Sequence, residues 1–154
     1  MKHLYNMILN ICSIFFIIIV IASIAQVFFR FVLDDPLVWS GELSRFLLLW
    51  MVFLGASVVS YKGAHLGVDF LFDYIPHKLT LVLKAVSLIV SLTFLVILIF
   101  SSLELLRVAG YTSSPALDIP MSYWRGSVVA GSILMILGMI VSAFNEYRQR
   151  KAGR

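Results

Sequence analysis

Charged side chains are scarce in this chain of 154 residues, where Asp, Glu, Lys and Arg together make up 13% of the sequence. Soluble domains carry about 25% charged residues, and only about half of their residues are apolar. Here apolar residues reach 61%, and the mean hydropathy is +1.00. The shortage of charge therefore excludes an ordinary water-soluble domain and predicts an integral membrane protein.

Cysteine is almost absent, because Cys12 is the single example and lies inside an apolar run. An internal disulfide and a zinc site both need several such ligands, so both are excluded. The three histidines, His3, His65 and His77, fall at or outside the predicted membrane surface. A haem held between helices would need axial histidines within the spans. The composition therefore predicts a protein without a metal or haem cofactor.

Motifs for catalysis are also lacking: the sequence has no glycine-rich phosphate loop, no nucleophile–base pair and no carboxylate cluster with metal spacing. The net charge of +4 does not predict a nucleic-acid partner, because the basic residues gather just after an apolar segment. That C-terminal charge cluster consists of Arg148, Arg150, Lys151 and Arg154. Such a position is typical of a cytoplasmic membrane flank. We expect neither an enzyme nor a nucleic-acid-binding protein.

Long apolar runs dominate what is present. A window of about 19 residues finds four segments that are long enough to cross a hydrocarbon core of about 30 Å. They cover approximately residues 5–29, 43–60, 79–106 and 123–144. Helices satisfy their own backbone groups in lipid, so the sequence predicts an all-α integral membrane protein with a single four-helix transmembrane domain over residues 1–154. Ser23-Ile24-Ala25 resembles a signal-peptidase site, but the apolar stretch is too long for a signal core and continues past it.

Positive charge is unevenly divided between the two sides that four spans define. The side with both termini carries eight of the twelve Lys and Arg residues and the other side four. The larger set is Lys2, Lys62, Lys78, Lys84, Arg148, Arg150, Lys151 and Arg154, and the smaller set is Arg30, Arg45, Arg107 and Arg125. Because Lys and Arg are enriched on the cytoplasmic side of membranes, we expect both termini in the cytoplasm.

Two short stretches are predicted to form amphipathic helices on the membrane surface, approximately over residues 36–43 and 62–75. In the second, polar and apolar side chains occupy opposite arcs of a helical wheel, as an interfacial helix requires. Asp35-Pro36 is a helix-start signal for the first. The residues expected to anchor the protein among membrane lipids are Trp39, His65, Asp69, Phe70, Asp73, Tyr74 and Trp124.

Glu42 and Arg45 lie at the start of the second predicted span, three residues apart, so they are neighbours on a helix. Two interpretations of this pair remain open. The residues could form a salt bridge where the helix enters the membrane, or they could dock another protein.

Small residues form a stripe on the fourth span, where Ser127, Gly131, Gly138 and Ser142 cluster on a helical wheel. Such stripes let a second helix approach closely in lipid. The partner could be a helix of this chain or of another subunit. Together with Trp39, Glu42, Arg45 and Gly55, the residues Ser127, Gly131 and Gly138 are our candidates for a subunit interface.

A small, self-sufficient proton-coupled drug exporter is the main alternative, because such proteins also have four spans in a short chain. Proton coupling would need an ionisable residue deep inside a span. Here Glu42 lies at the start of one predicted span and Glu104 near the end of another. This position disfavours the exporter without excluding it.

The order of residues resembles a known family. The run from Pro36 to Pro76 is similar to the small membrane subunit of tripartite ATP-independent periplasmic (TRAP) transporters. The matching residues are Trp39, Glu42, Arg45, Gly55, Ala56, His65, Val68, Asp69 and Pro76, and a second block matches through Pro115, Ala116, Leu117, Pro120 and Trp124. Two features depart from the family pattern: Gly41 replaces the first of two acidic residues, and Arg125-Gly126-Ser127-Val128 lacks a proline. The first departure argues against a role that needs a carboxylate pair, and the second bears on local helix shape.

This resemblance implies a set of partners and a location. Such a subunit would lie in the bacterial inner membrane beside a large membrane subunit that carries the substrate and sodium sites. A periplasmic binding protein would deliver an organic acid, such as a sialic acid or a C4-dicarboxylate. The small subunit would then be a non-catalytic scaffold that supports the moving large subunit and helps to dock the binding protein.

Overall fold

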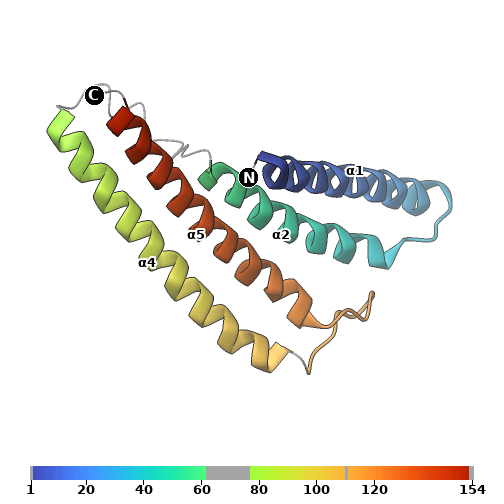
Figure 1. The fold of residues 1–154 in the computed structure, drawn as a ribbon. Helices are drawn as coiled ribbons and strands as arrows, with labels where there is room; N and C mark the ends of the chain where they lie inside the picture. The colour runs from blue at the N-terminus through green and yellow to red at the C-terminus, as the bar shows by residue number, and fades with distance from the viewer. Residues whose placement is uncertain (1, 62–76, 110, 153–154) are drawn as a thin grey trace.

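Four long helices form the structure, a computed structural model that describes residues 2–61, 77–109 and 111–152 (Figure 1). They are α1 (Lys2–Val32), α2 (Val38–Tyr61), α4 (His77–Ala109) and α5 (Met121–Ala152). Each is long and apolar enough to cross a membrane, which confirms the predicted all-α membrane fold. Every helix also continues beyond its predicted apolar segment. In α5 the reason is composition, because the polar stretch NEYRQRKA contains several strong helix formers.

The connection from α1 to α2 is a tight helix end. Both Leu33 N and Asp35 N donate hydrogen bonds to Phe29 O at 3.2 Å, and Asp34 between them has a φ of 54°. Aspartate tolerates this left-handed conformation better than most residues, and it closes the last turn of a helix. The chain then enters α2 at Val38. A surface helix was predicted over approximately residues 36–43; of these, residues 38–43 form the first turns of α2 and continue into it without interruption.

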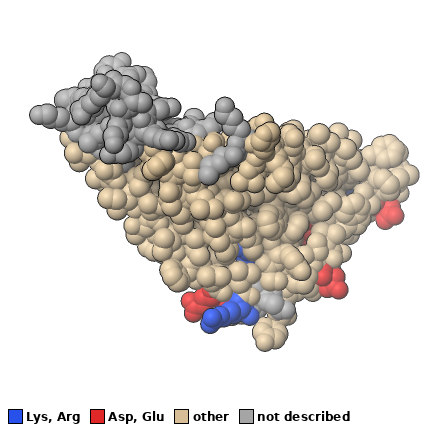
Figure 2. Space-filling model, viewed as in Figure 1, with Lys and Arg blue, Asp and Glu red and all other residues tan. Residues whose placement is uncertain are grey.

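The helices lie side by side in one layer, in the order α1, α2, α5 and α4 (Figure 1). The extensive contacts join α1 to α2, α2 to α5 and α5 to α4, so the chain order differs from the spatial order. A layer buries little of its own surface, and many large apolar side chains of α1 and α4 are exposed. Figure 2 shows the result: a broad uncharged face, with charged atoms mainly at its lower and right-hand margins.

The tightest helix contact lies between α2 and α5, and it uses the small residues of α5. A Cβ atom at Gly131 would overlap the Cβ of Phe53. A Cβ atom at Gly138 would lie 3.0 Å from Tyr61 N and 3.1 Å from Ser57 O. The backbones can therefore approach closely because these positions lack side chains. The structure thus pairs this part of the stripe with a helix of the same chain.

Several predictions fall on residues that the structure does not describe. The second surface helix, over residues 62–75, lies outside the described residues, and so do the anchor candidates His65, Asp69, Phe70, Asp73 and Tyr74. In the C-terminal charge cluster, Arg148, Arg150 and Lys151 belong to α5, whereas Arg154 lies outside the described part. The role of these residues stays a prediction.

Candidate functional site: Glu42 and the α4–α5 loop

The loop between α4 and α5 is folded back on itself as a short hairpin. Ser113 pairs with Pro120 in an isolated antiparallel bridge, and Ser114 N donates to Ile119 O at 2.9 Å. At the tip, Asp118 N donates to Ser114 O at 3.0 Å, and Asp118 has a φ of 53°. Aspartate and the preceding Pro-Ala-Leu sequence suit such a turn, because proline fixes its own φ and aspartate tolerates the left-handed region.

The turn leaves two backbone donors unused within the loop. A bond from residue 118 back to residue 114 closes one helical turn, in which the first N–H groups have no partner inside the turn. These donors are Ala116 N and Leu117 N. Successive N–H groups that point the same way form a concave site for an anion. The loop therefore offers a preformed place for a carboxylate.

Glu42 supplies that carboxylate from the second turn of α2. Ala116 N donates to both carboxylate oxygens, at 3.1 Å to Oε2 and 3.2 Å to Oε1. Leu117 N donates to Oε2 at 3.1 Å, and the hydroxyl of Ser114 donates to the same oxygen. Ser114 is 1% exposed. All these partners are donors, which suits an ionised carboxylate because that group only accepts.

The Glu42 side chain is bonded to the α4–α5 loop and not to its predicted neighbour Arg45. Among the residues that the structure describes, the hydrogen-bond partners of its side chain all belong to the α4–α5 loop. Arg45, the predicted neighbour, is exposed. Both sequence-based interpretations, a salt bridge to Arg45 and a contact with another protein, omitted this internal partner.

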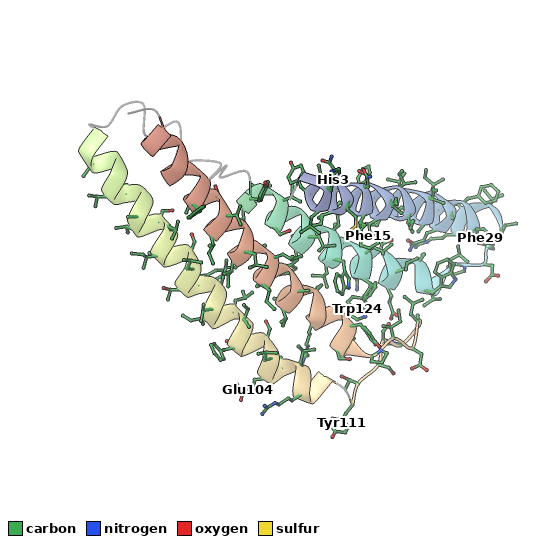
Figure 3. All side chains as sticks on the ribbon, in the orientation of Figure 1. His3, Phe15, Phe29, Glu104, Tyr111 and Trp124 are labelled. Carbon is green, nitrogen blue, oxygen red and sulfur yellow. The ribbon has the colours of Figure 1, made fainter. Side chains whose placement is uncertain are left out.

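An aromatic cluster lies next to the carboxylate site. The ring of Phe46, one turn after Glu42, meets the rings of Trp50 and Trp124 at centroid distances of 6.4 and 5.6 Å. Both pairs have the edge-to-face geometry that aromatic rings prefer. Trp124 therefore packs against α2 at the start of α5 (Figure 3), whereas Trp39 is 42% exposed. The predicted anchoring of both tryptophans in the membrane stays a prediction.

A second hydrogen bond near the α4–α5 loop joins α5 to α4. Arg125 in the first turns of α5 donates from Nη1 to the carbonyl oxygen of Leu105 at 2.7 Å. Leu105 lies near the C-terminal end of α4, where a positive side chain is favourable because that end of the helix dipole carries partial negative charge. The loop is thus flanked by a bond from α5 to α4 and by the bonds from the loop to α2.

The predicted interface residues occupy different surroundings. Ser127, Gly131 and Gly138 are buried, and the Ser127 hydroxyl donates to Trp124 O at 2.7 Å. Gly55 is half-buried, and a Cβ atom there would meet nothing within 4 Å. Arg45 and Trp39 are exposed. The contact of these residues with another subunit stays a prediction.

Ser114, Ala116 and Leu117 were not among the predicted site residues. Pro115, Ala116 and Leu117 did belong to the second block that carried the family resemblance, and Glu42 belonged to the first. The structure brings these two blocks together through the carboxylate. A single sequence carries no signal for this contact, because only covariation between related sequences would link positions so far apart.

The fold defines a multi-pass α-helical membrane protein with a hydrogen-bonded connection at one end of its layer. The profile of the family described as tripartite ATP-independent periplasmic transporters, DctQ component, matches residues 19–149. The match covers most of the sequence, and the chain belongs to this family. It is a small permease subunit of a TRAP transporter in the inner membrane, and it is a transporter component and not an enzyme. The resemblance seen in the sequence is confirmed.

Individual relatives carry related names. The chain is 28% identical over 157 residues to the sialic acid TRAP transporter small permease protein SiaQ of Vibrio cholerae, covering 94% of this chain and 86% of that protein. It is 31% identical over 80 residues to the C4-dicarboxylate TRAP transporter small permease protein DctQ of the same species, covering 52% and 34%. A stretch of 56 residues is 41% identical to the sialic acid TRAP transporter permease protein SiaT of Haemophilus influenzae, covering 36% of this chain and 9% of that protein.

Proposed function

We propose that this subunit is the fixed scaffold of a sodium-coupled transporter that imports an organic acid. The relatives are named for sialic acid and for C4-dicarboxylates, and both kinds of substrate carry carboxylates. Because these two names differ, the proposal extends to the class of organic acids and not to one compound. The chain would act with a larger membrane subunit and with a periplasmic binding protein that delivers the substrate.

The observation that carries this proposal is the open helix layer. A closed four-helix bundle surrounds its own core, whereas this layer leaves its edge helices with long apolar faces. On α4, for example, Ile89, Phe94 and Phe100 are 62%, 61% and 69% exposed. Such a surface suits a neighbouring membrane subunit as well as lipid, because helix association in membranes depends on packing area. A 56-residue stretch of this chain also matches 9% of the permease SiaT, so a segment similar to this chain forms part of a much longer permease. That match supports a close association between this chain and a permease.

The same proposal includes an orientation. The excess of positive charge at the termini favours both termini in the cytoplasm. The α1–α2 and α4–α5 connections would then face the periplasm. This orientation would set the loop that Glu42 binds on the side where a periplasmic binding protein approaches.

The proposed function can be tested by reconstitution. The subunit is expressed with a large permease subunit of a TRAP transporter, purified through a tag on one of the two chains, and inserted into liposomes with a periplasmic binding protein outside. We expect both chains to purify together and sodium-driven uptake of an organic acid to need all components. Liposomes with this chain alone are the control, and we expect them to transport nothing. Proton-driven export by the isolated chain would overturn the proposal in favour of the exporter.

A further inference from the structure

We propose that Glu42 is a positioning residue: its carboxylate fixes the α4–α5 loop in the shape that the periplasmic binding protein meets, without touching that partner itself. This inference rests on the proposed function, because it needs the loop on the periplasmic side. It differs from a docking contact by Glu42, since the residue acts through the loop.

The first step is that the loop's own backbone bonds leave the turn at its tip incompletely paired. Its backbone contacts are the isolated bridge between Ser113 and Pro120 and a few hydrogen bonds around it. Within the turn, Ala116 N and Leu117 N find no acceptor of the loop itself, and both donate to Glu42. An unpaired N–H group would favour other conformations that expose it to water. The acceptor that holds this turn therefore comes from α2.

The second step is that the bonds of the carboxylate within the described chain all go to the loop. Oxygen Oε2 accepts from Ser114, Ala116 and Leu117, and Oε1 accepts a longer bond from Ala116. Ser114 is almost completely buried. A partner that took Oε2 would have to displace three donors, whereas Oε1 keeps spare acceptor capacity. The geometry therefore assigns the carboxylate to the loop and leaves the outer face of the loop for a partner.

The third step is that this outer face is accessible. Ser113, Pro115 and Asp118 are exposed, and Tyr111 before them is 93% exposed. Figure 3 shows Tyr111 projecting from the end of the molecule, away from the helix layer. Surface loops held by a rigid scaffold are common binding sites, because their side chains are accessible while their backbone is fixed. The loop has both properties, with α2 as its scaffold.

The test is a double-mutant cycle in the complete reconstituted transporter, with the variants Glu42→Gln, Ser114→Ala and both together. Glutamine keeps the size of glutamate but removes one acceptor oxygen and the charge. The matched control is Glu104→Gln, which makes the same chemical change at an exposed glutamate near the end of α4. Two quantities are measured: the binding-protein concentration at half-maximal uptake, and hydrogen exchange at the amides of Ala116 and Leu117.

We expect Glu42→Gln to speed exchange of both amides by about tenfold or more, because each loses a charge-assisted bond. The half-saturating concentration of binding protein should rise several-fold, while the maximal rate at saturation stays within about twofold. Ser114→Ala should cause a smaller change of the same kind. The double variant should resemble Glu42→Gln, because residues that act through one contact are not additive. Glu104→Gln should change neither quantity.

Three results would overturn the inference. Unchanged amide exchange in Glu42→Gln would show that the carboxylate does not hold the loop. Faster exchange without a change in half-saturation would show that the binding protein does not meet the loop. Strictly additive effects on half-saturation would indicate a direct contact by Glu42. Failure of the proposed function is distinguishable, because the unsubstituted transporter would then show no uptake, whereas amide exchange can be compared without transport.

Discussion

The hydroxyl of Ser114 donates a hydrogen bond to the carboxylate of Glu42, although 72 positions separate the two residues in the chain. The bond joins the second turn of one helix to the loop between the last two helices. It is therefore a tertiary contact between two distant parts of the chain and not a local cap. Its consequences for stability and for membrane topology can be measured.

Ser114→Ala should lower the stability of the protein in detergent. The substitution removes the hydroxyl that donates to the Glu42 carboxylate; Ser114 is 1% exposed, whereas Glu42 itself is only partly buried. Unfolding by titration with a denaturing detergent measures this change. Ser113→Ala is the matched control, because that side chain is exposed on the same loop. Equal effects of the two substitutions would contradict the contact.

Gly131→Ala should weaken the contact between α2 and α5. The added Cβ atom would overlap Phe53, and overpacking of this kind costs about 1–3 kcal/mol. Gly126→Ala on the same helix is the control, since a Cβ atom there meets nothing within 4 Å. The control should be neutral or stabilising by up to about 1 kcal/mol, because alanine favours helix more than glycine does. A destabilised Gly126→Ala beside a neutral Gly131→Ala would contradict the observed packing.

Labelling of introduced cysteines tests the proposed orientation. In a Cys12→Ser background, Tyr111→Cys should react with a membrane-impermeant maleimide added outside spheroplasts, since Tyr111 is 93% exposed at the loop end. Ala152→Cys at the other end should react only after the membrane is opened. The charge bias of the termini is the reason for this expectation. The reverse labelling pattern would place both termini in the periplasm.

Arg125→Gln should lower the stability of the protein less than Ser114→Ala does. Arg125 donates to Leu105 O from a position with access to solvent, so its loss should cost about 1 kcal/mol or less. We expect faster amide exchange in the last turn of α4 and little change elsewhere. Arg107→Gln, at an exposed position near the same helix end, serves as the comparison. Loss of the whole fold in Arg125→Gln would show a larger role than the geometry supports.

The four spans could be predicted from sequence because crossing a membrane requires a long apolar run, which is a local property. The continuous helix from Val38 could not, because the polar residues before Phe46 gave no local signal to distinguish one helix from two. The small residues of α5 predicted a close contact, but Gly131 carries no information about which helix approaches it. The residues that bond Glu42 lie 72 to 75 positions away in the chain. Hydrophobic periodicity describes only the helix in which a residue lies, so it could not predict these partners.

The spatial order of the layer has a consequence for biosynthesis. The first two helices are adjacent in both sequence and space, so α1 and α2 can pair as soon as both are in the membrane. Among the described helices, α4 makes its extensive contact with α5, which is made last. The nascent chain must therefore hold α4 in lipid without its neighbour until translation of α5 is complete. Insertion of α5 then joins the early pair to the waiting helix, and a chain truncated before Met121 would lose the layer's connection.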